Sequence, residues 1–367
     1  MTGEVDVQTL QEWLAQGRPV KVLDVRPAPD RESWWIPGSQ HVDAYESLKA
    51  GSPGALADVS LPEGQLVVTV CGMGRASTQA AEVLAMQRGI PALSLNGGMK
   101  AWSLAWNTAA CSAGPVEITQ VRRTGKGCLS YFIRSEAEAA AIDASVDPDV
   151  YMSLAGQRGA RIRYVLDTHV HADHVSRARL LAQRSGAELI LPHQNRVRYP
   201  HRAVGEGDLL PLGATSIEVL ETPGHTDESV AYLVANAGIF TGDTLFLAGV
   251  GRPDLHADKT EAGVRARLLF RSLTKLTSLQ PQLLVFPCHT PQPVPFDGRV
   301  LTASLGEVVS RLGNWLASED EFVSLILRRI PPAPPNYVVI SRINERGEWP
   351  ECDLTDLEAG ANRCAVS

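Results

Sequence analysis

Residues 168–174 read THVHADH, so three histidines and one aspartate fall within six consecutive positions. The preceding residues 163–167 (RYVLD) resemble the end of a buried strand, which places the histidines on the loop that follows it. Imidazole and carboxylate groups are ligands of borderline divalent metals such as zinc and iron. With only 9 His in 367 residues, three in one hexapeptide favour a metal site over a chance polar loop.

Three more candidate ligands occur further along the chain, each directly after a short apolar run that predicts a buried strand. They are His225, Asp243 and His289, and the runs cover residues 217–220, 238–240 and 283–286. Ligands at strand ends, on tight Gly- and Pro-containing turns, are how a sheet builds a preorganised metal site. We therefore expect the four segments to converge on one centre.

This order of ligands resembles the signature of the metallo-β-lactamase-fold superfamily over about residues 116–330, and within it the persulfide dioxygenase and glyoxalase II branch. The supporting segments are 127–131 (GCLSY), 223–226 (PGHT), 242–246 (GDTLF) and 251–255 (GRPDL). The last is close to the Gly-Arg-Thr-Asp-Phe of persulfide dioxygenases, with Pro253 and Leu255 at the two differing positions. The resemblance implies an αββα sandwich.

The resemblance also implies alternative ligand sets. In persulfide dioxygenases one Fe(II) per chain would be held by His169, His225 and Asp243. In glyoxalase II all seven groups hold two metals, so zinc or a mixed binuclear centre is the alternative. The other four groups are either a second metal site or partners that orient the first; they are His171, Asp173, His174 and His289.

Two further residues near the ligands have competing interpretations. The guanidinium of Arg252 matches the geometry of a carboxylate, such as those of glutathione, and makes Arg252 a candidate substrate-binding residue. A structural salt bridge to Asp254 is the equally weighted alternative. Cys288, next to His289, takes the place of a glycine usual in the family, and we interpret it as a packing substitution.

A second motif is the segment 71–77 (CGMGRAS), which follows a buried-strand pattern at 65–70 and precedes a helical pattern at 78–86. A cysteine facing a helix N-terminus meets converging N–H groups and a positive dipole end, which lower the pKa of its thiol. We expect Cys71 to be an exposed nucleophile, with Arg75 adding positive charge. The loop residues expected to cradle its sulfur are Gly72, Met73, Gly74 and Ala76.

The flanks of this loop resemble a rhodanese domain over about residues 4–105. The matching segments are 22–26 (VLDVR), 36–39 (IPGS) and 95–102 (LNGGMKAW). The resemblance implies an α/β domain with a parallel sheet. It also implies that Cys71 accepts sulfane sulfur from thiosulfate or another donor as a persulfide, and passes it to a thiol acceptor.

The composition fits a two-domain α/β enzyme. Hydrophobic residues make up 44% and charged residues 20%, and the net charge of -7 without a basic run argues against a nucleic-acid partner. No window reaches the length of a membrane span, no signal-peptide pattern begins the chain, and the 6 Cys lack disulfide-framework spacing. We expect a cytoplasmic protein without a membrane partner, and leave a homodimer open.

The predicted organisation is a rhodanese-like domain over residues 1–106, a small, turn-rich linker over 107–115, and a metallo-β-lactamase-fold domain with a helical C-terminal extension over 116–367. The first functional hypothesis is an iron-dependent dioxygenase that converts glutathione persulfide and O2 to sulfite, joined to a sulfurtransferase. The second is a binuclear thioester hydrolase with an accessory rhodanese domain. The third is a sulfur carrier or sensor with a structural metal, which the open three-ligand site disfavours.

Overall fold

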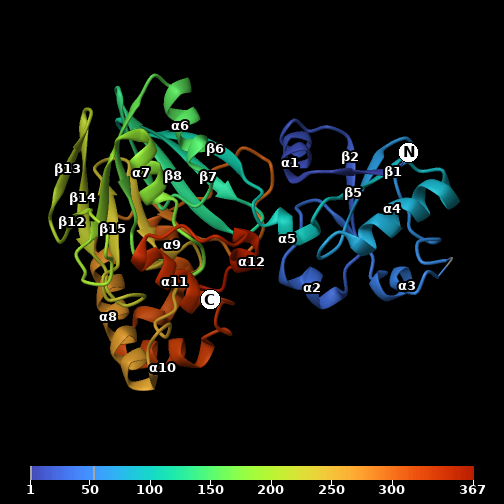
Figure 1. The fold of residues 1–367 in the computed structure, drawn as a ribbon. Helices are drawn as coiled ribbons and strands as arrows, with labels where there is room; N and C mark the ends of the chain where they lie inside the picture. The colour runs from blue at the N-terminus through green and yellow to red at the C-terminus, as the bar shows by residue number, and fades with distance from the viewer. Residues whose placement is uncertain (1, 53) are drawn as a thin grey trace.

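The computed structural model describes residues 2–52 and 54–367, which form two domains side by side (Figure 1). The N-terminal domain is built on a five-stranded parallel sheet of order β1-β5-β4-β2-β3. Its strands are β1 (Thr2–Val5), β2 (Val20–Asp24), β3 (Gln40–His41), β4 (Leu66–Val70) and β5 (Ala92–Leu95). Its helices are α1 (Val7–Ala15), α2 (Ala28–Ser33), α3 (Tyr45–Lys49), α4 (Arg75–Arg88) and α5 (Gly98–Trp102). The predicted parallel α/β domain is confirmed.

The central strand β4 shows why the sequence folds this way. Its side chains alternate between two cores, with Val67 in the cluster on one face and Val68 and Val70 in the cluster on the other. A strand covered on both faces is mostly apolar, and in residues 66–70 the one polar side chain, Thr69, donates to the carbonyl oxygen of Ser77 at 2.7 Å. Because β4 ends at Val70, Cys71 lies at its carboxyl end, four residues before α4 begins at Arg75.

The C-terminal domain is a sandwich of two larger sheets. The first has the order β12-β11-β10-β9-β8-β7-β6: β6 (Asn107–Ala113), β7 (Val116–Arg123), β8 (Cys128–Ser135), β9 (Glu138–Ile142), β10 (Arg161–Leu166), β11 (Glu188–Pro192) and β12 (Arg202–Val204). The second has the order β13-β14-β15-β16-β19-β20: β13 (Leu209–Leu212), β14 (Thr215–Glu221), β15 (Val230–Val234), β16 (Gly238–Gly242), β19 (Leu284–Pro287) and β20 (Ala303–Ser304). A small third sheet contains β17 (Leu245–Phe246), β18 (Gly249–Gly251) and β21 (Ala365–Val366).

Helices cover the outer faces of both large sheets, which confirms the predicted αββα sandwich (Figure 1). They are α6 (Pro148–Gln157), α7 (Ala178–Ser185), α8 (Lys259–Thr277), α9 (Leu305–Leu312), the 3-10 helix η1 (Gly313–Leu316), α10 (Glu319–Arg329), α11 (Tyr337–Arg346) and α12 (Leu354–Glu358). Between the sheets, the rings of Tyr131, Phe240 and Phe286 pack with centroids 4.9 to 5.6 Å apart. This aromatic contact ties the two sheets together beneath the strand ends.

The predicted linker over 107–115 is wrong in its local structure. Residues 107–113 form the strand β6, which pairs antiparallel with β7 from Asn107 opposite Arg122 to Ala113 opposite Val116. The strand is mostly small residues, with Thr108 its single β-branched side chain, and the sequence pattern therefore does not reveal it, because the pairing with β7 stabilises it rather than its own propensity. The two domains are therefore joined directly, without a free tether.

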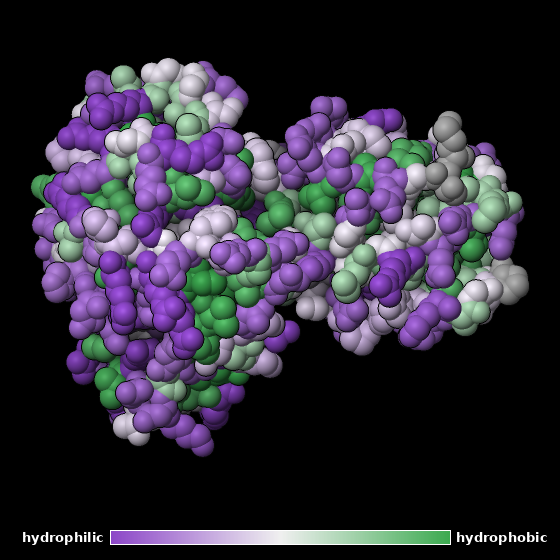
Figure 2. Space-filling model, in the orientation of Figure 1, coloured by the Kyte–Doolittle hydropathy of each residue, from purple (hydrophilic) through white to green (hydrophobic). Residues whose placement is uncertain are grey.

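The last part of the chain lies against both domains. Residues 337–367 contribute α11, α12 and β21, and α12 lies beside α5 of the N-terminal domain (Figure 1). Figure 2 shows two lobes joined at a narrower waist, with mostly hydrophilic residues on the visible outer surface. Among the helices of residues 2–52 and 54–367, none combines the length and the apolar character that a bilayer crossing needs.

Candidate functional site

Four strands place the predicted metal ligands at one edge of the sandwich. His169 follows β10 of the first sheet, whereas His225, Asp243 and His289 follow β14, β16 and β19 of the second. The strands are held in the sheets by their apolar side chains, so the loops at their ends have fixed positions. The convergence expected from the sequence is what the structure has.

Three of these side chains form a compact group. The Nε2 atoms of His169 and His225 lie 3.8 and 3.4 Å from Oδ2 of Asp243, and all three residues are buried. Oδ2 of Asp243 has no hydrogen-bond partner among the described residues. A buried carboxylate oxygen facing two imidazole nitrogens is a donor set that fits a divalent metal with open positions.

Contacts behind the imidazoles fix their orientation. Nδ1 of His225 donates to the carbonyl oxygen of Arg252 at 2.8 Å. Nδ1 of His169 lies 2.9 Å from Oγ1 of Thr168, whose hydroxyl in turn donates to Asp143 at 3.0 Å. Burial lowers the pKa of both histidines, so both rings are neutral and turn an Nε2 lone pair towards Asp243.

Two glycines allow the loops to come this close. A Cβ atom on Gly251 would lie 1.9 Å from the carbonyl oxygen of Asp243 and 3.0 Å from Cβ of His225. Gly242 has a positive φ of 51°, and a Cβ there would lie 2.5 Å from Oγ1 of Thr168. Any side chain at either position would push a ligand loop away.

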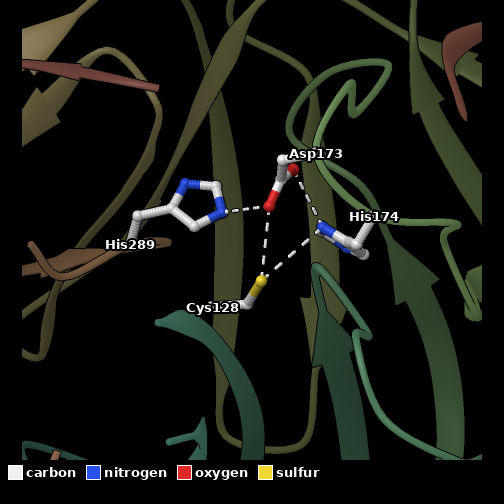
Figure 3. A group of neighbouring side chains, drawn as sticks. All are labelled: Cys128, Asp173, His174 and His289. Atoms are coloured by element: carbon white, nitrogen blue, oxygen red, sulfur yellow. Dashed lines mark hydrogen bonds and ion pairs between the residues drawn. The ribbon is translucent and has the colours of Figure 1, made fainter. Parts of the chain in front are cut away.

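Cys128, Asp173, His174 and His289 form a second buried group (Figure 3). Nδ1 of His174 is 3.0 Å from Oδ1 of Asp173, and the Cys128 thiol is 3.3 Å from Oδ2 of Asp173. Burial and the charge of Asp173 oppose ionisation of Cys128, yet contacts with His174 and His289 lower its pKa to about 7. The sequence analysis quoted Cys128 only as part of a resemblance and did not name it as a site residue.

His289 connects the two groups. Its Nδ1 lies 2.5 Å from Oδ1 of Asp243 and its Nε2 lies 3.0 Å from Oδ2 of Asp173. Burial opposes its charge, but the two carboxylates raise the pKa of His289 well above its usual value. The Cys288 thiol also donates to Oδ1 of Asp243, at 2.7 Å, so it contacts a predicted ligand and does more than fill space.

His171 lies apart from the three-residue group. Its Nε2 is 3.2 Å from Oδ1 of Asp143 and 3.8 Å from Oδ1 of Asp167, while its ring is 4.3 Å from that of His169. Burial, with the charge of Asp143 adding to it, raises the pKa of Asp167 to about 6 even though His171 acts in the opposite direction. The seven predicted groups thus lie in four overlapping or adjacent buried clusters, which also contain Cys128, Cys288, Asp143 and Asp167.

The N-terminal domain presents Cys71 on its own short loop. Its Sγ accepts from the backbone N–H of Gly74 at 3.1 Å and from the Ser77 hydroxyl at 3.4 Å. Gly74 has a φ of 101°, which turns the chain into α4. Contrary to the expected exposed thiol, Cys71 is only 2% exposed, because its loop and the start of α4 fold over it. Arg75 is the first residue of α4 and is exposed.

Comparisons with known proteins agree with both halves of this geometry. The metallo-beta-lactamase superfamily matches residues 123–289, and the rhodanese-like domain family matches residues 6–105. A probable metallo-hydrolase of Burkholderia pseudomallei is 32% identical over 245 residues, which is 54% of this chain and 80% of that protein. The chain belongs to the metallo-beta-lactamase superfamily. Its N-terminal domain is rhodanese-like.

Two other proteins are similar to this chain, one in sequence and one in structure. A hydroxyacylglutathione hydrolase of Anaeromyxobacter dehalogenans is 35% identical over 46% of this chain, which spans only 63% of that protein's length. The crystal structure of ETHE1 from Myxococcus xanthus aligns with a TM-score of 0.54 at 29% identity, covering 62% of this chain and 97% of that one. The similarity lies in the metallo-beta-lactamase domain.

The C-terminal segment contacts residues 169–174 of the metallo-beta-lactamase domain. This loop carries four of the predicted ligands and is called the metal loop below. The Asn344 amide donates to the carbonyls of His171 and His174 at 2.8 and 2.9 Å. Asn362 donates to Oδ2 of Asp173 at 2.8 Å. Sequence reasoning missed both residues, since single asparagines distant in sequence from the motif carry no recognisable signal.

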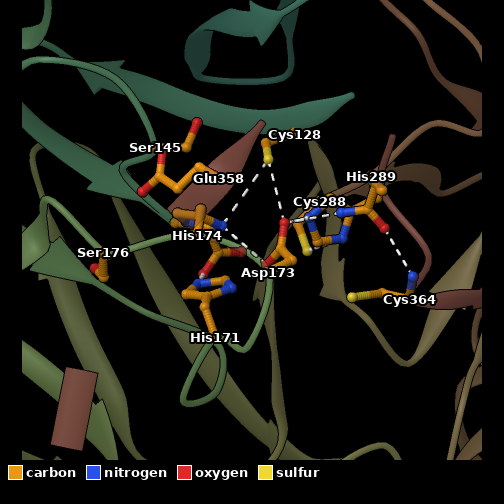
Figure 4. A network of polar contacts seen from close by, with 12 residues as sticks. Cys128, Ser145, His171, Asp173, His174, Ser176, Cys288, His289, Glu358 and Cys364 are labelled. Carbon is orange, nitrogen blue, oxygen red and sulfur yellow. Dashed lines mark hydrogen bonds and ion pairs between the residues drawn. The ribbon is translucent and has the colours of Figure 1, made fainter. Parts of the chain in front are cut away.

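Glu358, on α12, lies near His174 in the interior of the domain (Figure 4). It is fully buried, accepts from the N–H of Val175 at 2.7 Å, and pairs with Arg177 at 2.6 Å and Arg123 at 2.7 Å. Burial alone would raise its pKa, but the two arginines hold the pKa of Glu358 well below its usual range. The charged Glu358 thereby fixes the backbone that follows the His-x-His-x-Asp-His motif.

Arg252 has the structural role that the sequence analysis gave as the alternative. It is 1% exposed, and its Nε and Nη2 donate to the two oxygens of Asp254 at 2.8 Å. Its Nη1 donates to the carbonyls of Pro332 and Arg363. With all three nitrogens engaged, Arg252 joins the Gly251 turn to the C-terminal segment and is not placed to bind a substrate carboxylate.

Proposed function

We propose that this protein oxidises a low-molecular-weight persulfide, of the glutathione persulfide class, to sulfite at a single Fe(II), and that its rhodanese-like domain exchanges sulfane sulfur through Cys71. The main support for the proposal is that His289 is occupied by hydrogen-bond contacts, whereas three of the other predicted ligands face one another. His289 uses both ring nitrogens on Asp173 and Asp243, while the atoms of His169, His225 and Asp243 remain turned towards one another. One metal, held by three ligands, fits this arrangement.

The metal would be held by His169, His225 and Asp243, and when bound it would supply a redox-active Lewis acid with positions for O2 and the substrate sulfur. The remaining chemistry belongs to the chain. Thr168 and the Arg252 carbonyl keep each imidazole in the tautomer that offers Nε2. Burial excludes bulk water, which protects the persulfide and strengthens each electrostatic contact.

His289 and Cys288 hold the carboxylate ligand in place. Both contact Oδ1 of Asp243, which leaves Oδ2 as the single oxygen presented to the histidines. Such partners orient a ligand and tune its charge without touching the metal. His289 lies between Asp243 and Asp173, and these two carboxylates raise its pKa well above the usual value although burial opposes its charge.

In the rhodanese-like half, Cys71 is the nucleophile. The Gly74 N–H and the Ser77 hydroxyl donate to its sulfur and stabilise negative charge on it. The N-terminus of α4 adds its positive end. The loop is thus suited to stabilise an anionic persulfide on Cys71. That persulfide would be the intermediate between a sulfane-sulfur donor and a thiol acceptor.

The decisive experiment measures oxygen uptake and sulfite release with glutathione persulfide, together with iron content. We expect one Fe per chain, one O2 consumed per sulfite formed, and no turnover of S-lactoylglutathione. Hydrolysis of the thioester without oxygen uptake would reject the dioxygenase proposal.

A binuclear thioester hydrolase is the second candidate, and one observation favours it. All seven potential ligands of a two-metal site lie in adjacent buried clusters, and one relative is named a hydroxyacylglutathione hydrolase. This alternative requires His289 to exchange a carboxylate contact for a metal, whereas Nε2 of His174 and Nδ1 of His171 are buried without a partner among the described residues and are already free to bind one. This alternative predicts two metals per chain. It also predicts that a chelator which removes one of them abolishes thioester hydrolysis, and these two results separate it from the first proposal.

A further inference from the structure

A pocket of about 300 Å³ lies between the two domains, beside the loop that carries Cys71. The N-terminal domain and the metallo-beta-lactamase domain both line it. The first contributes Asp30, Ser33, Gly72, Met99 and Lys100 to its wall, and the second contributes Gly125, Ala359 and Gly360. Its volume is at the lower end of the range for small-molecule sites, about 300–1,000 Å³.

The pocket is fixed relative to Cys71. Gly72, the next residue, forms part of its wall. The carbonyls of Cys71 and Gly72 accept from the backbone N–H groups of Met99 and Lys100, at 2.8 and 3.0 Å, and both of these residues also line the pocket. A Cβ atom on Gly98 would lie 2.3 Å from the Cys71 carbonyl oxygen, so the loop rests directly on the start of α5.

Two segments lead from the opposite wall to the second ligand cluster, which His289 connects to the His169, His225 and Asp243 group. Gly125 precedes Cys128 of the second ligand cluster by three residues, which span at most about 10 Å. Gly360 precedes Asn362 by two residues, and Asn362 donates to Oδ2 of Asp173 at 2.8 Å. The pocket therefore lies within a few residues of chain from Cys71 and from the second ligand cluster.

Specific contacts hold the two walls together. The Trp34 indole donates to the carbonyl of Thr124 at 3.0 Å, and Nε of Arg123 donates to the carbonyl of Ser103 at 2.8 Å. A Cβ atom on Gly125 would lie 1.8 Å from the Trp102 carbonyl oxygen, so the backbones of the two domains touch. These contacts hold the two domains together on either side of the pocket, so its walls have fixed positions relative to each other.

We propose that this interdomain pocket binds the low-molecular-weight thiol that takes sulfane sulfur from Cys71 and carries it to the metal centre. The inference rests on the proposed function and names the binding site of its carrier. Lys100, which pairs with Asp356 across the interface, and Asp30 put both signs of charge on the wall. Such a lining is complementary to a zwitterionic thiol peptide with carboxylates and an ammonium group.

The sulfur transfer balances in two steps. The Cys71 thiolate attacks the outer sulfur of thiosulfate, whose S–S bond breaks to release sulfite and leave a Cys71 persulfide. The carrier thiolate then attacks the outer sulfur of that persulfide, the S–S bond breaks, and Cys71 leaves as the thiolate. The carrier is now a persulfide, held in the pocket between the two domains.

Filling the pocket tests the site. Ala359→Trp fills it from one domain and Ser33→Trp from the other, with Ala214→Trp on an exposed turn as the matched control. In the thiosulfate-to-glutathione transfer assay, we expect the KM for glutathione to rise at least tenfold in both pocket variants and to stay unchanged in the control. The use of two walls keeps the test valid if one variant fails to fold. A KM within threefold of the control in the folded variants would overturn the proposal.

Direct transfer is tested with the intact protein. Wild type is compared with an equimolar mixture of Cys71→Ser and Asp243→Ala proteins, each of which retains one centre. With thiosulfate and glutathione, we expect wild type to consume oxygen without a lag, and the mixture to show a lag while free glutathione persulfide accumulates. Equal time courses would overturn direct transfer. If wild type consumes no oxygen with pre-made persulfide, the proposed function fails, whereas the glutathione KM still reports on the pocket.

Discussion

The Cys71 loop and the metal centre are built in opposite ways. Both donors to the Cys71 sulfur, Gly74 and Ser77, lie within six residues of it. The proposed metal centre draws His169 and Asp243 from the ends of strands in two different sheets, and a segment from the far end of the chain covers the loop after His169. A local site depends on one loop, whereas a distributed site depends on every element that carries a ligand or positions one.

The largest difference between the two sites is expected for the Asp243→Ala variant. Asp243 is the one residue that both histidines of the triad face, so its loss removes the shared ligand. We expect loss of bound iron and of oxygen uptake, by at least a thousandfold, with thiosulfate sulfurtransferase activity unchanged. Metal analysis beside both assays checks this, and full iron content in the variant would contradict the triad.

The reciprocal change is Cys71→Ser. Sulfurtransferase activity should disappear, because a hydroxyl cannot carry sulfane sulfur, while oxygen uptake on pre-made glutathione persulfide stays within twofold. Mass spectrometry of the wild-type protein after thiosulfate should show one added sulfur at Cys71. A large loss of oxygen uptake in the variant would mean that the metal centre needs the cysteine itself.

Glu358→Gln tests how far the distributed site depends on its closure. Removing one partner of a buried ion pair costs about 3–5 kcal/mol, and two arginines lose theirs here. The pKa of Glu358 is lowered in the folded state, so its stabilisation is present above the unfolded value of about 4.3 and is lost as pH falls towards the folded pKa.

Urea unfolding checks this expectation. The difference between wild type and Glu358→Gln should be large at neutral pH and should shrink as pH falls below about 4.3. Glu348→Gln, at an exposed glutamate, is the control and should stay within about 0.5 kcal/mol of wild type. A Glu358 variant as stable as this control would show that the closure does not hold the metal loop.

His289→Ala distinguishes an orienting residue from a ligand. If His289 orients Asp243, the variant should bind one iron per chain with about 10–100-fold weaker affinity. Titration of the apoprotein with Fe(II) under anaerobic conditions measures both quantities. A fall from two metals to one, together with lost thioester hydrolysis, would instead support the binuclear alternative.

The smallest effect is expected for Ser77→Ala at the local site. The Ser77 hydroxyl is one of two donors to the Cys71 sulfur, and a hydrogen bond of this kind contributes about 1 kcal/mol, or roughly fivefold in rate. Stopped-flow loading of Cys71 with thiosulfate measures it, with Ser324→Ala on an exposed face of α10 as the control. An unchanged loading rate would assign the stabilisation to the Gly74 N–H and the helix end.

The sequence predicts what is local. The apolar runs before His225 and Asp243 are the strands β14 and β16, and the run before Cys71 is β4. Each motif carries its own structural context, since a buried strand fixes where the following loop begins. Both domain folds follow from these segments and the resemblances they carry.

The sequence does not predict contacts that depend on tertiary packing. Nothing around Asn344 or Glu358 announces that they hold the metal loop, because hydrogen bonds across 170 residues or more leave no local pattern. The burial of Cys71 escaped prediction because it depends on how its loop folds back over the thiol. Strand β6 was also not predicted, because its pairing with β7 rather than its composition stabilises it as a strand.

The closure by the C-terminal segment has a consequence for synthesis. The rhodanese-like domain is complete once about residue 105 has left the ribosome, whereas the metal loop lacks its hydrogen bond to Asn362 until the last part of the chain emerges. At about 5–20 residues per second, the ~260 residues between them take roughly 13–50 s. During that interval the Cys71 loop already has both of its local donors, while Asp173 still lacks its hydrogen bond from Asn362.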